Sequence, residues 1–308
     1  MAEKFNTLKR VKDHYEESLE YFKPNQIVGC YLQGSQNYSL DLPDSDVDTK
    51  LIVLPSFKDI VLASKPISTT HIRANDEHTD WKDIRLYMET FRKQNLNFLE
   101  ILFTDYKIIH PEYEPYWDIL VKNREGIARM NPYRAVKSMQ GIAKEKYHAM
   151  EHRYPAKVDI IDTYGYDPKQ VSHLVRVRDY LDRYIAGEAY EKCLKPSKDF
   201  FDLILDLKLC KYNLEDARAI ARQNLEHIDL VAKDFYENEE LIAMTRELTE
   251  MLRKNRTIDW QKKETARAGM RKMVKRLLKK YKYPPEQYEN AIEIVMSQCE
   301  MWTDNTEM

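Results

Sequence analysis

The spacing of hydrophobic residues divides the chain into a short region of mixed pattern and a longer region of helical pattern. Apolar residues recur at helical spacing over residues 8–22, and Lys23-Pro24-Asn25 ends that pattern. Short apolar runs of strand length follow at 27–32, 47–54 and 67–73, and the last resumes near 78–81. Helical spacing returns over 82–91, and a further buried segment begins at Leu99.

Strand signals nearly vanish after about residue 116. Helical patterns then cover residues 134–152, 168–185, 200–210, 214–237, 240–254 and 261–280. The change predicts an α+β protein, with a small α/β domain over residues 1–125 and a mainly helical domain over residues 126–308.

Composition limits the classes of protein that fit this pattern. The 308 residues are 43% hydrophobic and 32% charged, with a net charge of −2. Binding of nucleic acid over the whole protein surface is therefore not expected, although the composition permits local basic patches. The four cysteines form no CxxC pair, which is typical of free thiols in a reducing compartment. We find neither a signal-peptide pattern nor an apolar run of roughly 18 residues, so we expect a cytoplasmic globular protein without a membrane partner.

A Gly-Ser pair followed by two alternating carboxylates is the strongest chemical signal. In a strand, Asp46 and Asp48 project from one face, where two like charges raise each other's pKa. Such a pair is stable when it is solvated or when Mg²⁺, which prefers oxygen ligands, lies between the carboxylates. Gly34 lets the backbone approach a phosphate, and the Ser35 hydroxyl can bind it.

An acidic, turn-rich hairpin connection is the alternative explanation. Asp41, Asp44, Asp46 and Asp48 all lie in the same short segment, and Asp-Ser-Asp is common in turns. The position of Asp48 favours the metal site, because this residue lies inside an apolar strand, where a bare carboxylate is costly.

Three stretches together resemble a known family. They are GSQNYSLDLPDSDVDTKLIVLPS (34–56), DWKDIRLYMETFRKQNLNFLEILFT (80–104) and GYDPKQVSHLVRVRDYLDRYIAGEAYEKCL (165–194). The first is similar to the signature of polymerase-β-type nucleotidyltransferases. All three, in this order, resemble the predicted nucleotidyltransferase or RNA-repair-pathway polymerase-β family of bacteria and phages, over about residues 25–215.

The resemblance implies a catalytic domain with a mixed sheet flanked by helices, and a helical domain that completes the cleft for nucleotide and acceptor. It implies that Asp46 and Asp48 bind Mg²⁺, or Mn²⁺ in its place, and that Gly34 and Ser35 contact the nucleotide phosphates. Members usually add a third carboxylate for a second metal, and Asp80 is our choice. Asp76, Glu77 and Asp83 remain alternatives, and a helix N-cap is the competing role for Asp80 or Asp83.

The third stretch places three basic residues on one helix face. Lys169, His173 and Arg176 follow each other at four- and three-residue spacing, which suits a phosphate-rich ligand. A solvated face that pairs with Asp179 or Asp182 is the alternative, and the resemblance favours the nucleotide cleft.

Residues 261–285 form a second basic segment with an apolar stripe. A terminal helix docked by that stripe, a surface for an RNA backbone, and a helix adsorbed to a membrane all fit the pattern.

The resemblance implies a magnesium-dependent transferase. It would move a nucleoside monophosphate from an NTP such as ATP to a hydroxyl acceptor and release pyrophosphate, with an RNA 3′ end, as in RNA repair, the favoured acceptor. An enzyme that nucleotidylates a protein or a small molecule is one alternative. A non-catalytic NTP- or RNA-binding module is the other.

Overall fold

The computed structural model describes residues 2–43, 45–255, 264–283, 285 and 288–304. Its contacts divide the chain into two compact units, Met1–Ala232 and Lys233–Met308. The division falls within one long helix, α12 (Leu214–Asn255). We describe each unit separately.

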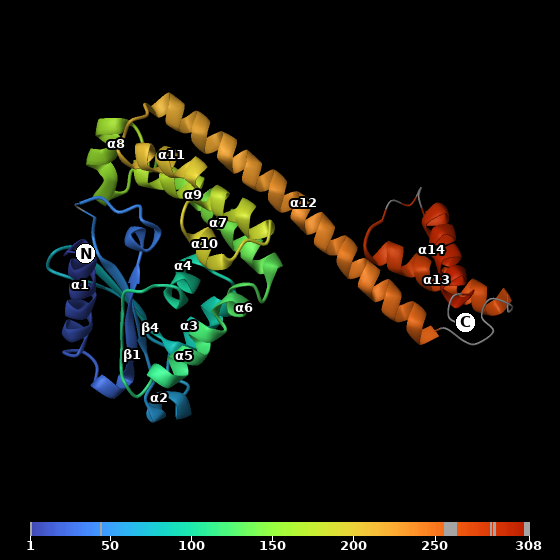
Figure 1. Ribbon diagram of the computed structural model, residues 1–308, viewed down its shortest axis with the longest axis horizontal. Coiled ribbons are helices and arrows are strands. Elements are labelled where there is room, and N and C mark those ends of the chain that lie inside the picture. The colour runs from blue at the N-terminus through green and yellow to red at the C-terminus, as the bar shows by residue number, and fades with distance from the viewer. Residues whose placement is uncertain (1, 44, 256–263, 284, 286–287, 305–308) are drawn as a thin grey trace. The chain divides into compact units, whose positions relative to one another are not determined.

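A five-stranded mixed sheet lies at the centre of the first unit (Figure 1). Its order is β3 (Ser68–Ile72), β4 (His78–Asp83), β2 (Asp48–Val53), β1 (Ile27–Gln33) and β5 (Lys107–Ile109). The β2–β4 pair is parallel, and the other pairs are antiparallel. With helices around this sheet, the α+β prediction is confirmed.

The two central strands are buried on both faces because helices cover each side of the sheet. On one side, Val11 of α1 (Ala2–Ser18) packs in a core with Cys30, Leu32 and Leu51. On the other, the Tyr31 ring lies 4.4 Å from Trp117 of α5 (Glu114–Lys122). Burial on both faces explains why these strands read as continuous apolar runs.

The remaining helices of the first unit are mostly short. They are η1 (Pro24–Gln26), η2 (Ser35–Tyr38), α2 (Phe57–Val61), α3 (Ile84–Arg92), α4 (Leu96–Leu99), η3 (Glu100–Leu102), α6 (Arg124–Ala128), α7 (Pro132–Ala149), η4 (Pro155–Lys157), α8 (Val158–Tyr164), α9 (Pro168–Ile185), α10 (Tyr190–Leu194) and α11 (Lys198–Lys208).

Helix α9 is the centre of the helical layer, because α7, α10 and α11 all pack against it. These helices also contact the sheet region: the ring of Tyr190 stacks on that of Phe103 at 4.9 Å. The expected boundary between residues 125 and 126 therefore lies inside the first compact unit, and the functional division at that point stays a prediction.

The second unit contains the end of α12 with α13 (Glu264–Lys280) and α14 (Tyr288–Asp304). Its core joins Val274 and Leu278 of α13 to Ile292 and Met296 of α14, with Leu248 of α12 packed against them.

Helix α12 corrects one sequence expectation, since two helices were predicted at 214–237 and 240–254. The polar residues Glu237-Asn238-Glu239-Glu240 interrupt the apolar pattern, but they include no glycine or proline to break a helix. None of the described helices combines the length and apolar character that a membrane span requires.

Candidate functional site

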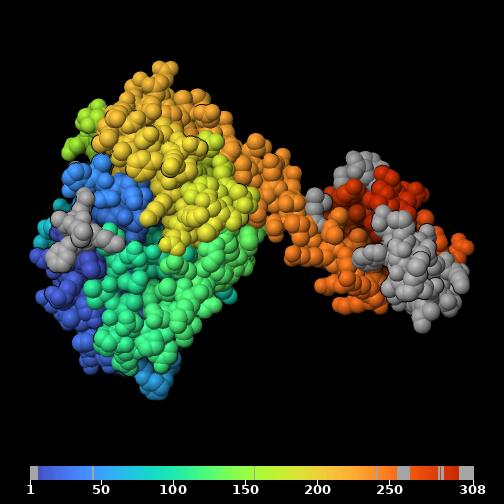
Figure 2. All heavy atoms as spheres, in the orientation of Figure 1, coloured from blue at the N-terminus to red at the C-terminus, as the bar shows by residue number. Residues whose placement is uncertain are grey.

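A pocket of about 470 Å³ opens between the β1–β2 connection and helices α8, α9 and α11. In Figure 2 the blue surface that follows β1 adjoins the yellow surface around α11, where Lys208 donates a hydrogen bond to the Leu40 carbonyl. The pocket brings together most of the predicted site residues. Those lining it are Gly34, Ser35, Asp46, Asp48, Lys169, His173 and Arg176.

Gly34 follows β1 and is the N-cap of η2. Its φ of 104° and ψ of −154° belong to a region that residues with a side chain rarely adopt. An added Cβ would have room, since the nearest atom, Oε1 of Gln36, is 4.0 Å away. The backbone conformation, rather than crowding, therefore requires glycine at the mouth of the pocket.

Asp46 and Asp48 form an acidic wall of the pocket. Oδ1 of Asp48 accepts a hydrogen bond from the His78 backbone N–H at 3.0 Å and lies 3.8 Å from His78 Nδ1. The carboxylate of Asp46 is exposed and has no hydrogen-bond or ion-pair partner among the described residues. Two carboxylates with free oxygens on one wall are a suitable donor set for a hard divalent cation.

Within the described ranges, no three His, Cys, Asp or Glu side chains gather closely enough to hold a metal ion. Two carboxylates alone match the usual Mg²⁺ site, in which water and substrate phosphates supply the other oxygens. The residues present therefore fit one magnesium ion at Asp46 and Asp48.

Asp80 does not line the pocket. It is paired in register with Lys50 and so shares a sheet face with Asp48. Lys50 Nζ lies 3.6 Å from the Asp80 carboxylate, which also accepts a hydrogen bond from Thr70 at 2.6 Å. Burial lowers the pKa of Lys50 to about 8, although Asp80 opposes the shift. In this structure a lysine is the cation beside Asp80.

The three alternatives to Asp80 also lie outside the lining of the pocket. Asp76 lies in the turn between β3 and β4 with φ of 63°. Asp83 is the N-cap of α3, where it accepts a hydrogen bond from the Arg85 N–H at 2.8 Å. Glu77 is buried behind the acidic wall and contacts α1.

Arg176 dominates the opposite, basic wall. Its side chain is almost fully buried, and its Cζ lies 3.9 Å from the centre of the Tyr38 ring. The Nε and Nη1 atoms have no hydrogen-bond partner in the described part of the chain. A buried guanidinium with two unpaired nitrogen atoms is a suitable site for an anion, because an anion could accept the hydrogen bonds that these two donors do not otherwise make.

His173 and Lys169 extend this wall along α9. Burial and the nearby cations Arg176 and Lys146 lower the pKa of His173, so its ring is neutral at pH 7. Lys169 is exposed at the start of the helix.

The alternative partners proposed for this helix face are engaged elsewhere. Asp179 accepts hydrogen bonds from Ser197, and Asp182 contacts His227 at 2.8 Å.

Glu100 is a site residue that sequence reasoning did not identify. It lies in η3, fully buried close to Arg176 and to the backbone of Gly34. Burial raises the pKa of Glu100 to about 8, against the opposing effects of Arg176 and Gly34. The sequence signal was an acid within the apolar run Leu99-Glu100-Ile101-Leu102-Phe103.

Comparison with known proteins gives a family match in the C-terminal part of the chain. Residues 225–305 match a family model described as type I restriction enzyme HindI endonuclease subunit-like, C-terminal. The type I restriction enzyme HindI endonuclease subunit of Haemophilus influenzae is 36% identical over 133 residues, which are 41% of this chain. The chain spans only 12% of the length of that relative.

A solved structure of a nucleotidyltransferase-like protein from Exiguobacterium sibiricum aligns with 72% of this chain and 73% of its own. The TM-score is 0.31 at 15% identity, which is too low to support a statement about fold. The α+β assignment therefore rests on the sheet and helices themselves. The family match from residue 225 begins beyond residues 25–215, which carry the nucleotidyltransferase resemblance.

Proposed function

We propose that this protein transfers a nucleoside monophosphate from an NTP to a hydroxyl acceptor. One observation carries the proposal: a single pocket contains two carboxylates, Asp46 and Asp48, and the buried guanidinium of Arg176, whose Nε and Nη1 atoms have no hydrogen-bond partner among the described residues. Substrates that carry both phosphates and a divalent cation match this combination of charges.

Each part of the pocket has a role in this reaction. Arg176 and Lys169 bind the phosphate oxygens, while Gly34 and Ser35 let the backbone approach them. Asp46 and Asp48 would hold Mg²⁺ or Mn²⁺, and the ion would supply positive charge to neutralise the phosphates. The acceptor hydroxyl loses its proton to water as its oxygen bonds to the α-phosphorus. The bond between the α-phosphorus and the oxygen that bridges to the β-phosphorus breaks, and pyrophosphate leaves.

Asp80 is proposed as the third carboxylate, with Lys50 as its present partner. A second ion at Asp80 would have to compete with the Lys50 ammonium. The pKa of Lys50, lowered to about 8, makes its proton easier to lose than that of an exposed lysine.

The acceptor that we favour is an RNA 3′ end, and α13 supports this choice. Its residues Arg271, Lys272, Arg276 and Lys279 are exposed and make no ion pair with described residues. The apolar residues of the same helix, including Val274 and Leu278, are buried in the core of the second unit. They are therefore not free to insert into a membrane, whereas the cations remain available to a phosphate backbone.

The test is pyrophosphate release with each of the four NTPs and Mg²⁺, in the presence of RNA. Asp48→Asn keeps an oxygen that can accept the His78 N–H, so the fold should persist while the metal ligand weakens. We expect release to fall by at least about 100-fold, because metal stabilisation of the transition state is worth several kcal/mol.

The matched control is Asp182→Asn, which alters a carboxylate outside the pocket. Wild-type activity in Asp48→Asn would contradict the mechanism. With a radiolabelled NTP, transfer of the label to a protein or a small molecule, rather than to RNA, would identify the other class of acceptor. NTP binding without pyrophosphate release would indicate a non-catalytic binding module.

The family match at residues 225–305 favours a second, compatible role for the C-terminal unit. The relative is named as a subunit, so we propose that Lys233–Met308 attaches this chain to a larger assembly. An apolar pocket of about 180 Å³ with the exposed Ile294 at its edge supports this role. The native mass of the complex from source cells should exceed that of the chain, and Ile294→Asp should reduce it. An unchanged native mass in that variant would contradict the proposal.

A further inference from the structure

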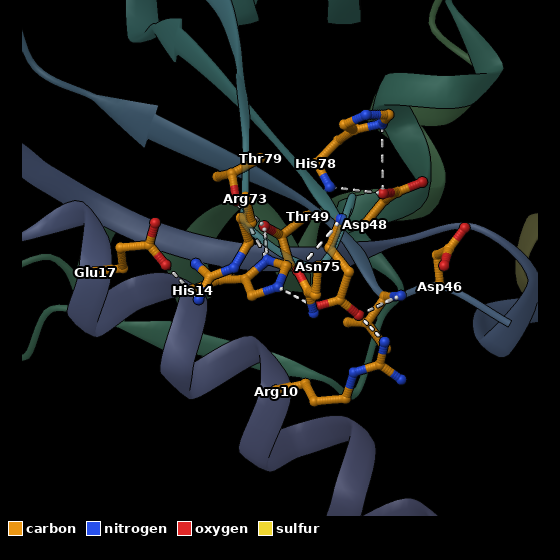
Figure 3. A network of polar contacts seen from close by, with 12 residues as sticks. Arg10, His14, Glu17, Asp46, Asp48, Thr49, Arg73, Asn75, His78 and Thr79 are labelled. Atoms are coloured by element: carbon orange, nitrogen blue, oxygen red, sulfur yellow. Dashed lines mark hydrogen bonds and ion pairs between the residues drawn. The ribbon is translucent and has the colours of Figure 1, made fainter. Parts of the chain in front are cut away.

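A buried polar network lies directly behind the acidic wall. His14 of α1 and Glu77, which precedes β4, are 1% and 2% exposed, and His14 Nε2 lies 2.9 Å from Glu77 Oε2. Figure 3 shows the His14 ring directed from α1 toward the start of β2, where Thr49 lies. The network therefore connects the N-terminal helix to the strand that begins with Asp48.

Glu77 holds the residue between the two pocket carboxylates. Its Oε1 accepts a hydrogen bond from the Val47 N–H at 2.9 Å and forms an ion pair with Arg10. Asn75 donates a further hydrogen bond to Oε2 at 2.8 Å. Because the Val47 side chain is fully buried as well, both its backbone and its side chain are fixed.

His14 holds the residue after Asp48. Its Nδ1 lies 2.9 Å from the Thr49 hydroxyl and 3.2 Å from the Thr79 hydroxyl. Burial, with the nearby charges of Arg73 and Arg10, lowers the pKa of His14 to about 3. In a neutral ring with its proton on Nε2, Nε2 donates to Glu77 and Nδ1 accepts a hydrogen bond from one of the two threonine hydroxyls.

Burying a carboxylate is costly, and an apolar replacement of similar volume is often as stable as a buried ion pair. A contribution to stability is therefore a weak explanation for a buried glutamate at position 77. Its position gives a stronger one, because it binds the N–H of Val47, which separates Asp46 from Asp48.

We propose that Glu77 and His14 are positioning residues that fix the spacing of the Asp46 and Asp48 carboxylates for a divalent cation. The proposal rests on the metal site of the proposed function but not on transfer itself. Loss of a hydrogen bond that orients metal ligands without contacting the metal typically weakens metal affinity by about 10- to 100-fold.

The experiment measures Mn²⁺ binding to the intact chain by the electron paramagnetic resonance of the free ion, without nucleotide. Glu77→Ala removes the acceptor for Val47, and we expect Mn²⁺ to bind at least about 10-fold more weakly. Glu77→Gln keeps an oxygen acceptor but not the charge, so we expect a smaller loss of about threefold, which is partial rescue. Urea unfolding of each variant reports stability separately.

Two variants complete the design. Asp182→Asn breaks a His–carboxylate contact of similar length away from the pocket and should leave Mn²⁺ affinity unchanged. The Asp46→Ala/Asp48→Ala double variant should abolish the site.

A folded Glu77→Ala protein with wild-type Mn²⁺ affinity would overturn the proposal. If that variant does not fold, unchanged affinity in Glu77→Gln would do the same. Mn²⁺ binding that survives the double variant would also overturn it. Binding that depends on Asp46, Asp48 and Glu77, without pyrophosphate release from the wild type, would refute the proposed transfer and leave the positioning role intact.

Discussion

The two compact units bury side chains of different character. In the first unit, the pocket is surrounded by buried charged groups, including Glu77, Glu100 and Arg176. In the second, the pocket is lined by apolar side chains and one tyrosine, and the cations of α13 are exposed. Buried charges are costly and must be arranged precisely, whereas exposed charges on a helix have little effect on stability.

We propose that this difference reflects a separation of tasks. The first unit has the fixed donors and acceptors that a small phosphate ligand requires. The second has a charged outer surface and an apolar hollow, which suit contacts with macromolecules. Substitutions in one unit should therefore affect different measurements from substitutions in the other.

Among the substitutions that compare the two units, the one at the buried guanidinium of Arg176 has the largest expected effect. Arg176→Ala removes the donors of the basic wall, and hydrogen bonds to charged groups are worth about 1.5–3 kcal/mol. We expect KM for NTP to rise roughly 10- to 100-fold, as measured by pyrophosphate release. Arg178→Ala is the matched control, because Arg178 is on the same helix but lies over the Phe200 ring outside the pocket. Equal KM values for the two variants would contradict the proposal that Arg176 binds the NTP phosphates.

The second effect concerns stability of the first unit at acidic pH. The His14 pKa is about 3 in the folded chain, against an ordinary value of 6.5, so below pH 6.5 the unfolded chain binds the extra proton. The stabilisation due to neutral His14 is therefore complete above pH 6.5 and is lost as pH falls toward 3, by up to about 1.4 kcal/mol per pH unit.

Urea unfolding of wild type and His14→Gln between pH 7 and pH 5 measures this loss. The difference in unfolding free energy between the two proteins should shrink as the solution is acidified. A difference that stays constant over this range would show that His14 is not held neutral.

The smallest effect is expected on the exposed cations of the second unit. Lys272→Ala removes one exposed charge from α13, so the slope of log affinity for single-stranded RNA against log salt should fall by about 0.7. KM for NTP should not change. Lys233→Ala, which alters a lysine paired with Glu237 on α12, is the control. A change in KM for Lys272→Ala would contradict the separation of tasks.

Short-range patterns account for part of the candidate site. The helical spacing of Lys169, His173 and Arg176 predicts that they share one face of a helix, and α9 covers all three. Strand alternation does not account for Asp46 and Asp48 in the same way, because β2 begins at Asp48 and Asp46 precedes it. That the two sets line one pocket depends on packing of α9 beside the β1–β2 connection. The helix α9 itself agrees with its predicted range, 168–185.

The sequence also determined the α+β class, because hydrophobic periodicity is a local property. Only the tertiary structure decided which carboxylates are free and which are paired. Asp80 forms an ion pair with Lys50 because of the register between their strands. Glu77 forms a hydrogen bond with His14, which is 63 positions away in the chain. Such pairings depend on contacts between distant segments, and no local pattern records them.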